Sequence, residues 1–244
     1  MTPVEDAQPA LRLLRRGAIT VKGLMPDCSN YTYLAQVCAP DGDRETLAIY
    51  KPMRGEIPLG DFPSGTLGKR EVAAYLVDRA LGWEIVPPTV YRGDGPLGPG
   101  SLQLFVRADL QEHYFTLLAA HADAFRVMAA FDCIVNNADR KSGHCLLDGD
   151  GHIWGVDNGL TFHPLPKLRT VIWEFAREEI PPRLREDAAR LARDLEQEAP
   201  WARPLTRLLA PAEVRALAGR ARRVAGDGRY PEPSSRWAYP WPLV

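Results

Sequence analysis

The sequence is poor in cysteine and has no long apolar run. Its 244 residues include four cysteines, and none of them belongs to a CxxC pair or another spacing typical of a metal site. So few scattered cysteines predict reduced thiols and not a disulfide scaffold. No apolar stretch reaches the ~20 residues that a membrane helix needs, and the first residues lack the basic and apolar segments of a secretory signal. We therefore expect a soluble protein of the cytoplasm.

The net charge is small, and lysine is rare. The formal net charge is −1, which argues against bulk attraction to nucleic acid or anionic lipid, although a local basic patch is not excluded. Only five of the 30 basic residues are lysines. In a chain that uses arginine by default, lysine indicates a position that needs a compact ammonium group. We expect no nucleic-acid partner, and each lysine becomes a candidate site residue.

The two halves of the chain differ in pattern. The first half alternates short β-branched and aromatic segments with turns, which predicts strands at 18–25, 31–39, 45–52, 84–93 and 100–108. Apolar residues at helical spacing predict helices at 69–82, 121–137, 170–178, 182–199 and 210–226, with two short strands within 144–157. We expect an α+β protein with a five-stranded, one-helix N-terminal lobe, residues 1–106, and a mostly helical C-terminal lobe, residues 107–244.

Two polar loops stand out in the second half. The segment NNADRKSGH at 136–144 follows an apolar helix, and VDNG at 156–159 follows the two short strands. Each loop supplies one aspartate, Asp139 and Asp157. Two carboxylates at the mouth of a cleft can form an acid–base pair or a metal site. Each aspartate alone is more often a cap or turn residue, so the assignment depends on the residues that accompany them.

The accompanying residues fit phosphoryl transfer. In that chemistry one aspartate orients the attacking hydroxyl and a second holds Mg²⁺ against the phosphates, roles that fall to Asp139 and Asp157. Lys141 could offset charge at the γ-phosphate. Lys51, at the end of LAIYK, would meet the α- and β-phosphates, and Glu71 in the next helix would hold that lysine in position. Any one of these residues has an ordinary structural explanation, but the ordered set favours a kinase.

These residues lie in segments that resemble a known family. LAIYKP, KREVAAYLVDRALGWEIVPPTVY, GSLQLFV, NNADRKSGH and VDNGLTF occur in the expected order over residues 20–170. They resemble the phosphatidylinositol 3-/4-kinase-like group, most closely the type II phosphatidylinositol 4-kinases. Small actinobacterial proteins of unassigned substrate are similar too, and the arginine-rich composition suits such a bacterial source. The resemblance implies a two-lobed protein-kinase-like fold with ATP and Mg²⁺, or Mn²⁺, in the cleft between the lobes.

The resemblance also implies positions for the rest of the nucleotide. The adenine would contact the backbone of the QLFV segment, chiefly at Phe105 and Val106. The turn LMPDCSNY, with Ser29 and Asn30, would cover the phosphates in place of a glycine-rich loop. A short polar turn can do this with backbone N–H groups and a hydroxyl.

Three departures from the family pattern concern the metal and the acceptor. The family has an asparagine five residues after the catalytic aspartate, where this chain has His144. Because Mg²⁺ prefers oxygen ligands, His144 is open to three roles: a ligand of Mn²⁺, a ligand through a water molecule, or a structural side chain. The cysteine-rich insertion of the eukaryotic enzymes is missing between Lys51 and Glu71, and the chain beyond residue 170 matches nothing assignable.

Several functions therefore stay open. The acceptor of the phosphate could be a phosphoinositide, a related polyol or a protein hydroxyl. A nucleotide-binding pseudokinase with a regulatory or scaffold role is the alternative that His144 favours, whereas AMP transfer has no positive sign. The tail RWAYPWPLV holds Trp237, Tyr239 and Trp241, residue types common at membrane interfaces. We expect the tail to pack on its own lobe, with transient membrane contact as the alternative.

Overall fold

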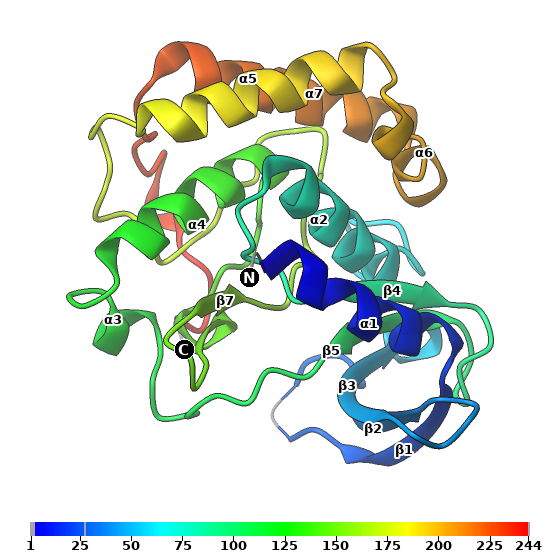
Figure 1. Ribbon diagram of the computed structural model, residues 1–244. Coiled ribbons are helices and arrows are strands. Elements are labelled where there is room, and N and C mark those ends of the chain that lie inside the picture. The colour runs from blue at the N-terminus through cyan, green and yellow to red at the C-terminus, as the bar shows by residue number, and fades with distance from the viewer. Residues whose placement is uncertain (1–2, 27, 244) are drawn as a thin grey trace.

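The computed structural model describes residues 3–26 and 28–243, which form a β-rich N-terminal part and a mostly helical C-terminal part (Figure 1). The N-terminal part is a five-stranded antiparallel sheet in the order β1-β2-β3-β5-β4. The strands are β1 (Ala18–Leu24), β2 (Tyr33–Cys38), β3 (Glu45–Pro52), β4 (Thr89–Arg92), β5 (Gly100–Leu104), β6 (Cys145–Leu147) and β7 (Ile153–Gly155). The predicted α+β class, with an antiparallel-sheet lobe and a helical lobe, is confirmed.

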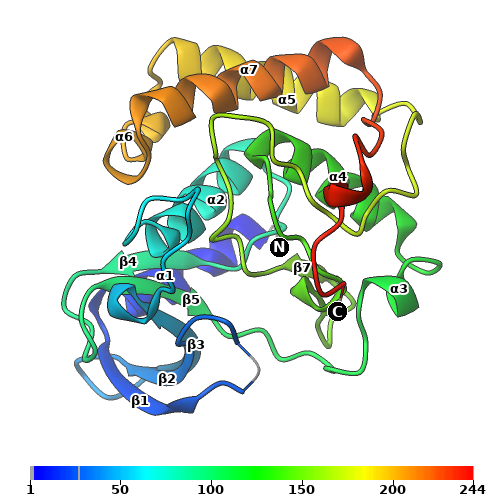
Figure 2. The ribbon, with the colours of Figure 1, turned by 180° about the vertical axis from the view of Figure 1, so that it is seen from behind.

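Two of the longer helices, α1 (Pro3–Arg16) and α2 (Leu67–Leu81), pack on the sheet. The other longer helices build the C-terminal part and are α4 (Ala122–Val135), α5 (Pro182–Glu196) and α7 (Pro211–Asp227). The short helices are α3 (Tyr114–Leu117) and α6 (Leu205–Leu208), with 3₁₀ turns η1 (Met53–Gly55), η2 (Ser142–His144), η3 (Pro200–Ala202) and η4 (Arg236–Ala238). In both views α5 and α7 lie side by side across α4 and above α2 (Figures 1 and 2). This helical layer therefore spans both parts of the molecule.

Helix α1 corrects the expectation of a single helix in the N-terminal lobe. No element was predicted before residue 18, and Pro9 lies inside the helix that the structure forms there. Leu11 and Leu14 on this helix are buried against the sheet. The guanidinium of Arg92 on β4 donates to the carbonyls of Leu14 and Gly17 at 2.8 and 2.9 Å, so the end of α1 is tied to the sheet edge.

Helix α2 crosses the sheet and carries Glu71. It ends as predicted at Gly82, whose φ of +74° is the left-handed conformation that glycine adopts without strain. The carboxylate of Asp78 accepts the N–H groups of Ile85 and Val86 at 3.1 and 3.0 Å, which fixes the chain as it leaves the helix. Because α2 starts at Leu67, two residues earlier than predicted, Glu71 lies in its second turn instead of its first.

The segment 170–178 is not the predicted helix but a series of turns. Its backbone has other partners: the Val171 N–H donates to the Arg140 carbonyl at 3.0 Å, and the Thr170 N–H donates to the Ala238 carbonyl at 3.1 Å. Tertiary hydrogen bonds to the loop after α4 and to the C-terminal tail thus replace the helical bonds. The apolar spacing that suggested a helix instead buries Val171, Ile172 and Phe175.

The C-terminal tail (residues 228–243) runs beside α4 toward β7 (Figure 2). The Ser142 N–H donates to the Leu243 carbonyl at 2.8 Å, and Ala238 is buried, so the tail contacts its own lobe. Trp237 and Trp241 remain 69% and 88% exposed, so these two aromatic side chains are not covered. None of the helices within residues 3–26 and 28–243 combines the length and apolar content that a membrane crossing requires.

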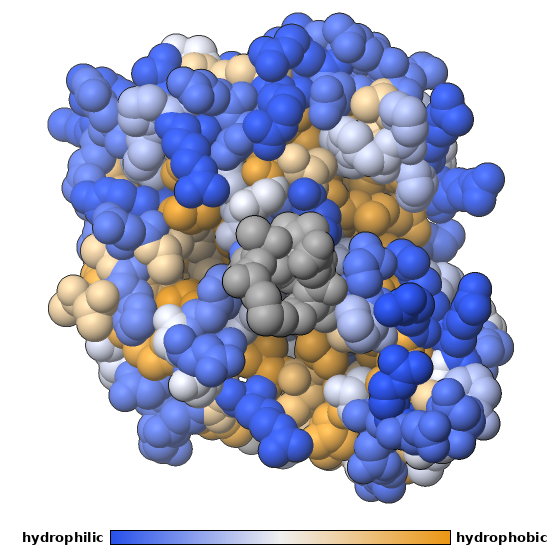
Figure 3. Space-filling model, viewed as in Figure 1, coloured by the Kyte–Doolittle hydropathy of each residue, from blue (hydrophilic) through white to orange (hydrophobic). Residues whose placement is uncertain are grey.

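The distribution of hydrophilic and apolar side chains matches the arrangement of the helices. The surface over α5 and α7 is hydrophilic, whereas apolar side chains gather in the band beneath that layer (Figure 3). Leu184, Leu191 and Leu195 of α5 and Leu217 of α7 are buried in the same core as Phe125 and Phe131 of α4. One continuous core therefore joins the sheet, α2, α4 and the outer helices.

Candidate active site

Lys51 lies at the centre of a charged group between the two parts of the molecule. Its ammonium is 2.6 Å from the Glu71 Oε1 and 2.7 Å from the Asp157 Oδ1. Strand β3 presents the lysine, α2 the glutamate and the loop after β7 the aspartate. The structure thus brings together three predicted residues that lie far apart in the sequence.

The charges in this group stabilise one another. Burial opposes the charge of Lys51, but the carboxylates of Asp157 and Glu71 outweigh it and raise the pKa of the lysine. The Lys51 ammonium in turn holds the pKa of Asp157 well below its ordinary value. Lys51 is therefore a permanent cation and Asp157 a permanent anion near neutral pH.

Glu71 also holds the loop that carries Asp157. Its second oxygen, Oε2, accepts the backbone N–H of Asn158 at 3.0 Å, and the Glu71 side chain is 3% exposed. Asp157 itself has a φ of +56°, an uncommon conformation for a residue other than glycine. The contact with Glu71 fixes the neighbouring peptide group, so it helps to keep this strained turn in place.

Asp139 lies in the loop that follows α4. The helix ends at Asn136, which adopts a left-handed φ of +56°, and the Asp139 N–H donates to the side-chain oxygen of Asn137 at 3.0 Å. The Lys141 ammonium lies 3.5 Å from the Asp139 Oδ2. Burial raises the pKa of Asp139 to about 6, although Lys141 acts in the opposite direction. Asp139 is therefore an ionised carboxylate at neutral pH with greater basicity than an ordinary aspartate.

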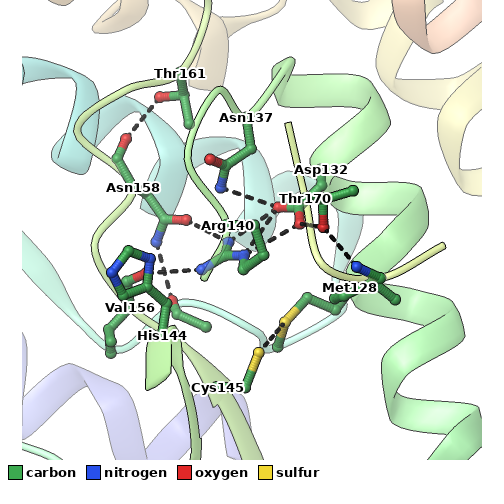
Figure 4. Close-up of polar contacts among 12 residues, drawn as sticks. Met128, Asp132, Asn137, Arg140, His144, Cys145, Val156, Asn158, Thr161 and Thr170 are labelled. Carbon is green, nitrogen blue, oxygen red and sulfur yellow. Dashed lines mark hydrogen bonds and ion pairs between the residues drawn. The ribbon is translucent and has the colours of Figure 1, made fainter. Parts of the chain in front are cut away.

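A buried network that was not predicted from the sequence lies behind Asp139. The Arg140 guanidinium lies 3.0 Å from the Asp132 Oδ1 on α4, and both side chains are fully buried (Figure 4). Arg140 also donates to the Asn158 Oδ1 at 2.7 Å and to the Val156 carbonyl at 2.7 Å. Arg140 thus connects the Asp139 loop to the Asp157 loop. The sequence did contain one sign of this network: Asp132 is an acid within the apolar helix predicted at 121–137, and a buried carboxylate needs a partner.

His144 contacts Asp157 through one ring nitrogen. The Nε2 lies 3.4 Å from the Asp157 Oδ2, and the Nδ1 accepts the Lys141 N–H at 3.3 Å. Burial lowers the pKa of His144 to about 4, so the ring is neutral at pH 7. A neutral imidazole whose Nδ1 accepts a hydrogen bond carries its proton on Nε2. In this tautomer His144 donates toward Asp157.

The carboxylate of Asp157 suits a hard cation whose other ligands are waters and substrate phosphates. Within residues 3–26 and 28–243, no three His, Cys, Asp or Glu side chains gather closely enough to hold a metal ion. Mg²⁺ typically takes one or two protein carboxylates and completes its shell with waters and substrate phosphates. Asp157, half exposed beside Lys51, fits that use.

The predicted phosphate turn is anchored at its base. The Asn30 Oδ1 accepts the Ile57 N–H at 2.8 Å, and the Tyr31 N–H donates to the Gly55 carbonyl at 3.1 Å. The Asn30 side chain is thus engaged in holding two loops together. Ser29 is exposed, whereas Asp27 of the same turn lies outside the described residues.

Phe105 and Val106 continue the chain beyond β5. The Phe105 N–H donates to the Leu47 carbonyl at 3.0 Å and extends the sheet pairing by one residue. The Val106 N–H has no hydrogen-bond partner among the residues that the structure describes. The Val106 N–H and the carbonyl groups of this segment are the groups that a planar base could meet.

The geometry divides the predicted residues into groups. Lys51, Glu71, Asp157 and His144 are linked by direct contacts, and Asp139 forms a second pair with Lys141. The remaining predicted residues are Ser29, Asn30, Phe105 and Val106. They lie in other segments of the N-terminal part, and no side-chain contact in the described chain joins them to either charged group.

Comparisons with known proteins identify a relative of the chain and a solved structure with a similar fold. No family model matches the chain. A curated protein, Protein Rv2133c from Mycobacterium tuberculosis, is 39% identical over 265 aligned residues that cover 94% of each chain. Among solved structures, the proinflammatory kinase CtkA from Helicobacter pylori has a TM-score of 0.52 at 11% identity, covering 86% of this chain and 93% of its own. The fold is thus that of a kinase.

Proposed function

The chain belongs to the family of Protein Rv2133c, and we propose that it is a kinase that moves the γ-phosphate of ATP to a hydroxyl acceptor. The observation that carries this proposal is the position of Lys51 between Glu71 and Asp157. An ammonium held between a helix carboxylate and a loop carboxylate is the arrangement that kinases use to bind nucleotide phosphates and their metal ion. The kinase fold supports the same interpretation.

In this proposal the nucleotide lies between two lobes that divide at residues 106 and 107. The adenine meets the backbone of Phe105 and Val106, and the turn with Ser29 and Asn30 covers the phosphates. The acceptor is a phosphoinositide or a related polyol, as the resemblance to type II phosphatidylinositol 4-kinases implies. A protein hydroxyl is the alternative acceptor.

Asp139 acts as the base. Its carboxylate accepts the proton of the acceptor hydroxyl as that oxygen bonds to the γ-phosphorus and the bond to the bridging oxygen of ADP breaks. The raised pKa of about 6 favours this proton transfer while leaving the side chain ionised at pH 7. Lys141 lies 3.5 Å from Asp139 and offsets negative charge on the transferred group.

Asp157 would hold Mg²⁺ or Mn²⁺, which neutralises charge on the β- and γ-phosphates when it is bound. The tautomer of His144 directs its N–H toward Asp157, so we assign His144 the task of orienting that carboxylate. Lys51, which now neutralises Asp157, would turn to the α- and β-phosphates. Glu71 keeps the lysine in reach during this exchange.

A labelling experiment tests this function and identifies the acceptor class. The protein is incubated with γ-labelled ATP, Mg²⁺ or Mn²⁺, and a bacterial extract that is afterwards separated into lipid, protein and small-molecule fractions. We expect label in one fraction, and its loss in the isosteric variant Asp139→Asn. Asp150→Asn, in the exposed turn between β6 and β7, is the matched control and should retain transfer. ATP binding without transfer under either cation would instead indicate a regulatory pseudokinase.

A further inference from the structure

Arg70 is one of the largest fully buried side chains of the protein and adjoins Glu71 on α2. Its three guanidinium nitrogens have separate partners. The Nη2 lies 2.5 Å from the Glu213 Oε1, the Nη1 donates to the Thr161 carbonyl at 2.6 Å, and the Nε donates to the Thr66 hydroxyl at 3.2 Å. The guanidinium also lies over the Phe62 ring, with its carbon 5.0 Å from the ring centre. Nothing in the proposed chemistry requires this cation.

The partner Glu213 lies in the first turn of α7, far along the chain. Its Oε2 accepts the N–H of Ala210 at 2.8 Å, so the same carboxylate caps α7 and receives Arg70. In both views the outer helical layer passes above α2 (Figures 1 and 2). The Arg70–Glu213 pair is therefore a direct link between the helix of Glu71 and the C-terminal helices.

The contact with Thr161 closes a ring of hydrogen bonds beside Lys51. The Thr161 hydroxyl donates to the Asn158 carbonyl at 2.7 Å, and the Asn158 N–H donates to Glu71 at 3.0 Å. Since Arg70 and Glu71 are neighbours on α2, the two residues grip the loop 157–161 at both ends. Movement of α2 along this loop would break the contacts of Arg70 and Glu71 together.

Stability alone does not explain this arrangement. A buried ion pair is commonly no more stabilising than apolar residues of the same volume, while removal of one partner is costly. What the pair adds is a fixed geometry, because a planar guanidinium with three partners tolerates little displacement. We propose that Arg70 is a positioning residue that locks α2 to the loop 157–161 and to α7, so that Glu71 stays on Lys51. This proposal rests on the proposed kinase function.

The consequence is that the C-terminal helices form part of the nucleotide-binding machinery. Through Glu213, the chain itself holds α2 in the position that pairs Lys51 with Glu71.

Three variants test the lock. Arg70→Met removes all polar contacts. Arg70→Lys keeps a charge for Glu213 but cannot bridge to Thr161 at the same time. Arg92→Met is the matched control, since Arg92 is a buried arginine whose polar partners in the described chain are Asp94 and two carbonyl groups at the end of α1, and not residues of α2.

Hydrogen exchange gives a readout that does not depend on activity. At a temperature where all variants are folded, we expect faster exchange of amides at 67–71 and 157–161 in Arg70→Met than in Arg92→Met. Arg70→Lys should keep a melting temperature near that of the wild type and still exchange faster at 157–161. Unchanged exchange in both Arg70 variants would overturn the proposal.

Kinetics separate this proposal from the function on which it rests. If the wild type transfers phosphate, Arg70→Met should lower kcat/KM by between about 10- and 100-fold, the effect of misplacing a catalytic group by about 1 Å. Arg92→Met should stay close to the wild type. Equal losses in the two variants would reduce Arg70 to a structural residue. Faster exchange in Arg70→Met together with an inactive wild type would refute the kinase function and support the lock.

Discussion

Asp139, which lies beside Lys141, is the group whose protonation should govern the reaction. Burial raises the pKa of Asp139 to about 6, and the ammonium of Lys141 moderates that rise. A base must be ionised, so the active fraction decreases as pH falls below this pKa. We expect kcat/KM to be level above pH 6 and to fall about tenfold per pH unit below it.

The variant Lys141→Met tests whether Asp139 causes this fall of kcat/KM at acidic pH, called the acidic limb below. Without the ammonium the pKa of Asp139 rises further, so the limb should move to higher pH, whatever the loss of maximal rate. The measurement is the pH dependence of kcat/KM for both proteins from pH 5 to 8. A limb at the same pH in the variant would show that another group titrates.

The proposed role of His144 leads to a second prediction about a single residue. If its N–H orients Asp157, His144→Gln keeps a donor and should preserve the ratio of the rates with Mn²⁺ and Mg²⁺, whereas His144→Phe should lower both rates equally. A direct imidazole ligand would favour Mn²⁺ over Mg²⁺. Loss of a Mn²⁺ preference in His144→Gln would therefore contradict the orienting role.

The residues that could be predicted from the sequence are recognisable by their type and order, whereas the others depend on contacts made only in the fold. Lys51, Glu71 and Asp157 could be predicted because their types and order along the chain match a reaction. Asp132 could be noticed as an acid on an apolar helix, but its pairing with Arg140 could not be predicted, because that pairing depends on which loop crosses behind α4. The pairing of Arg70 with Glu213 joins residues separated by 143 positions, and no local pattern indicates it.

At the scale of elements, strands and long helices followed from periodicity, and the errors arose where tertiary contacts decide. The five strands and the end of α2 at Gly82 were predictable from local pattern and turn chemistry. The segment 170–178 has helical spacing, yet its N–H groups bind Arg140 and the tail region. Helix α1 contains Pro9, and its position is fixed by contacts with β4.

Two glycine substitutions should change stability in opposite directions. Gly82 has a φ of +74° and open space around it, so Gly82→Ala meets only backbone strain and should destabilise the fold by about 1 kcal/mol. Gly219 lies within α7 with open space as well, so Gly219→Ala should stabilise by about 0.5–1 kcal/mol. Urea denaturation measures both. Stabilisation by Gly82→Ala would contradict the left-handed end of α2, and destabilisation by Gly219→Ala would contradict open helical surroundings at Gly219.

At the scale of the whole molecule, the layer of α5 and α7 joins α2, which packs on the sheet, to α4, which precedes the loop of Asp139. It covers α4, and Glu213 reaches the helix that carries Glu71. The general α+β architecture was predictable from the change in pattern near residue 107. This crossing layer was not, since the sequence beyond residue 170 indicates amphipathic helices but not the face on which they pack.

The central claim is that Lys51, held between Glu71 and Asp157, is the phosphate-binding centre of a kinase. Calorimetric titration with ATP, in the presence and absence of Mg²⁺, tests it most directly in the wild type, Lys51→Met and the control Lys69→Met on α2. We predict Mg²⁺-dependent ATP binding that is weakened about tenfold or more in Lys51→Met, the cost of losing a charged hydrogen-bond donor, and is unchanged in Lys69→Met. Equal affinity of the wild type and Lys51→Met for ATP would contradict the account.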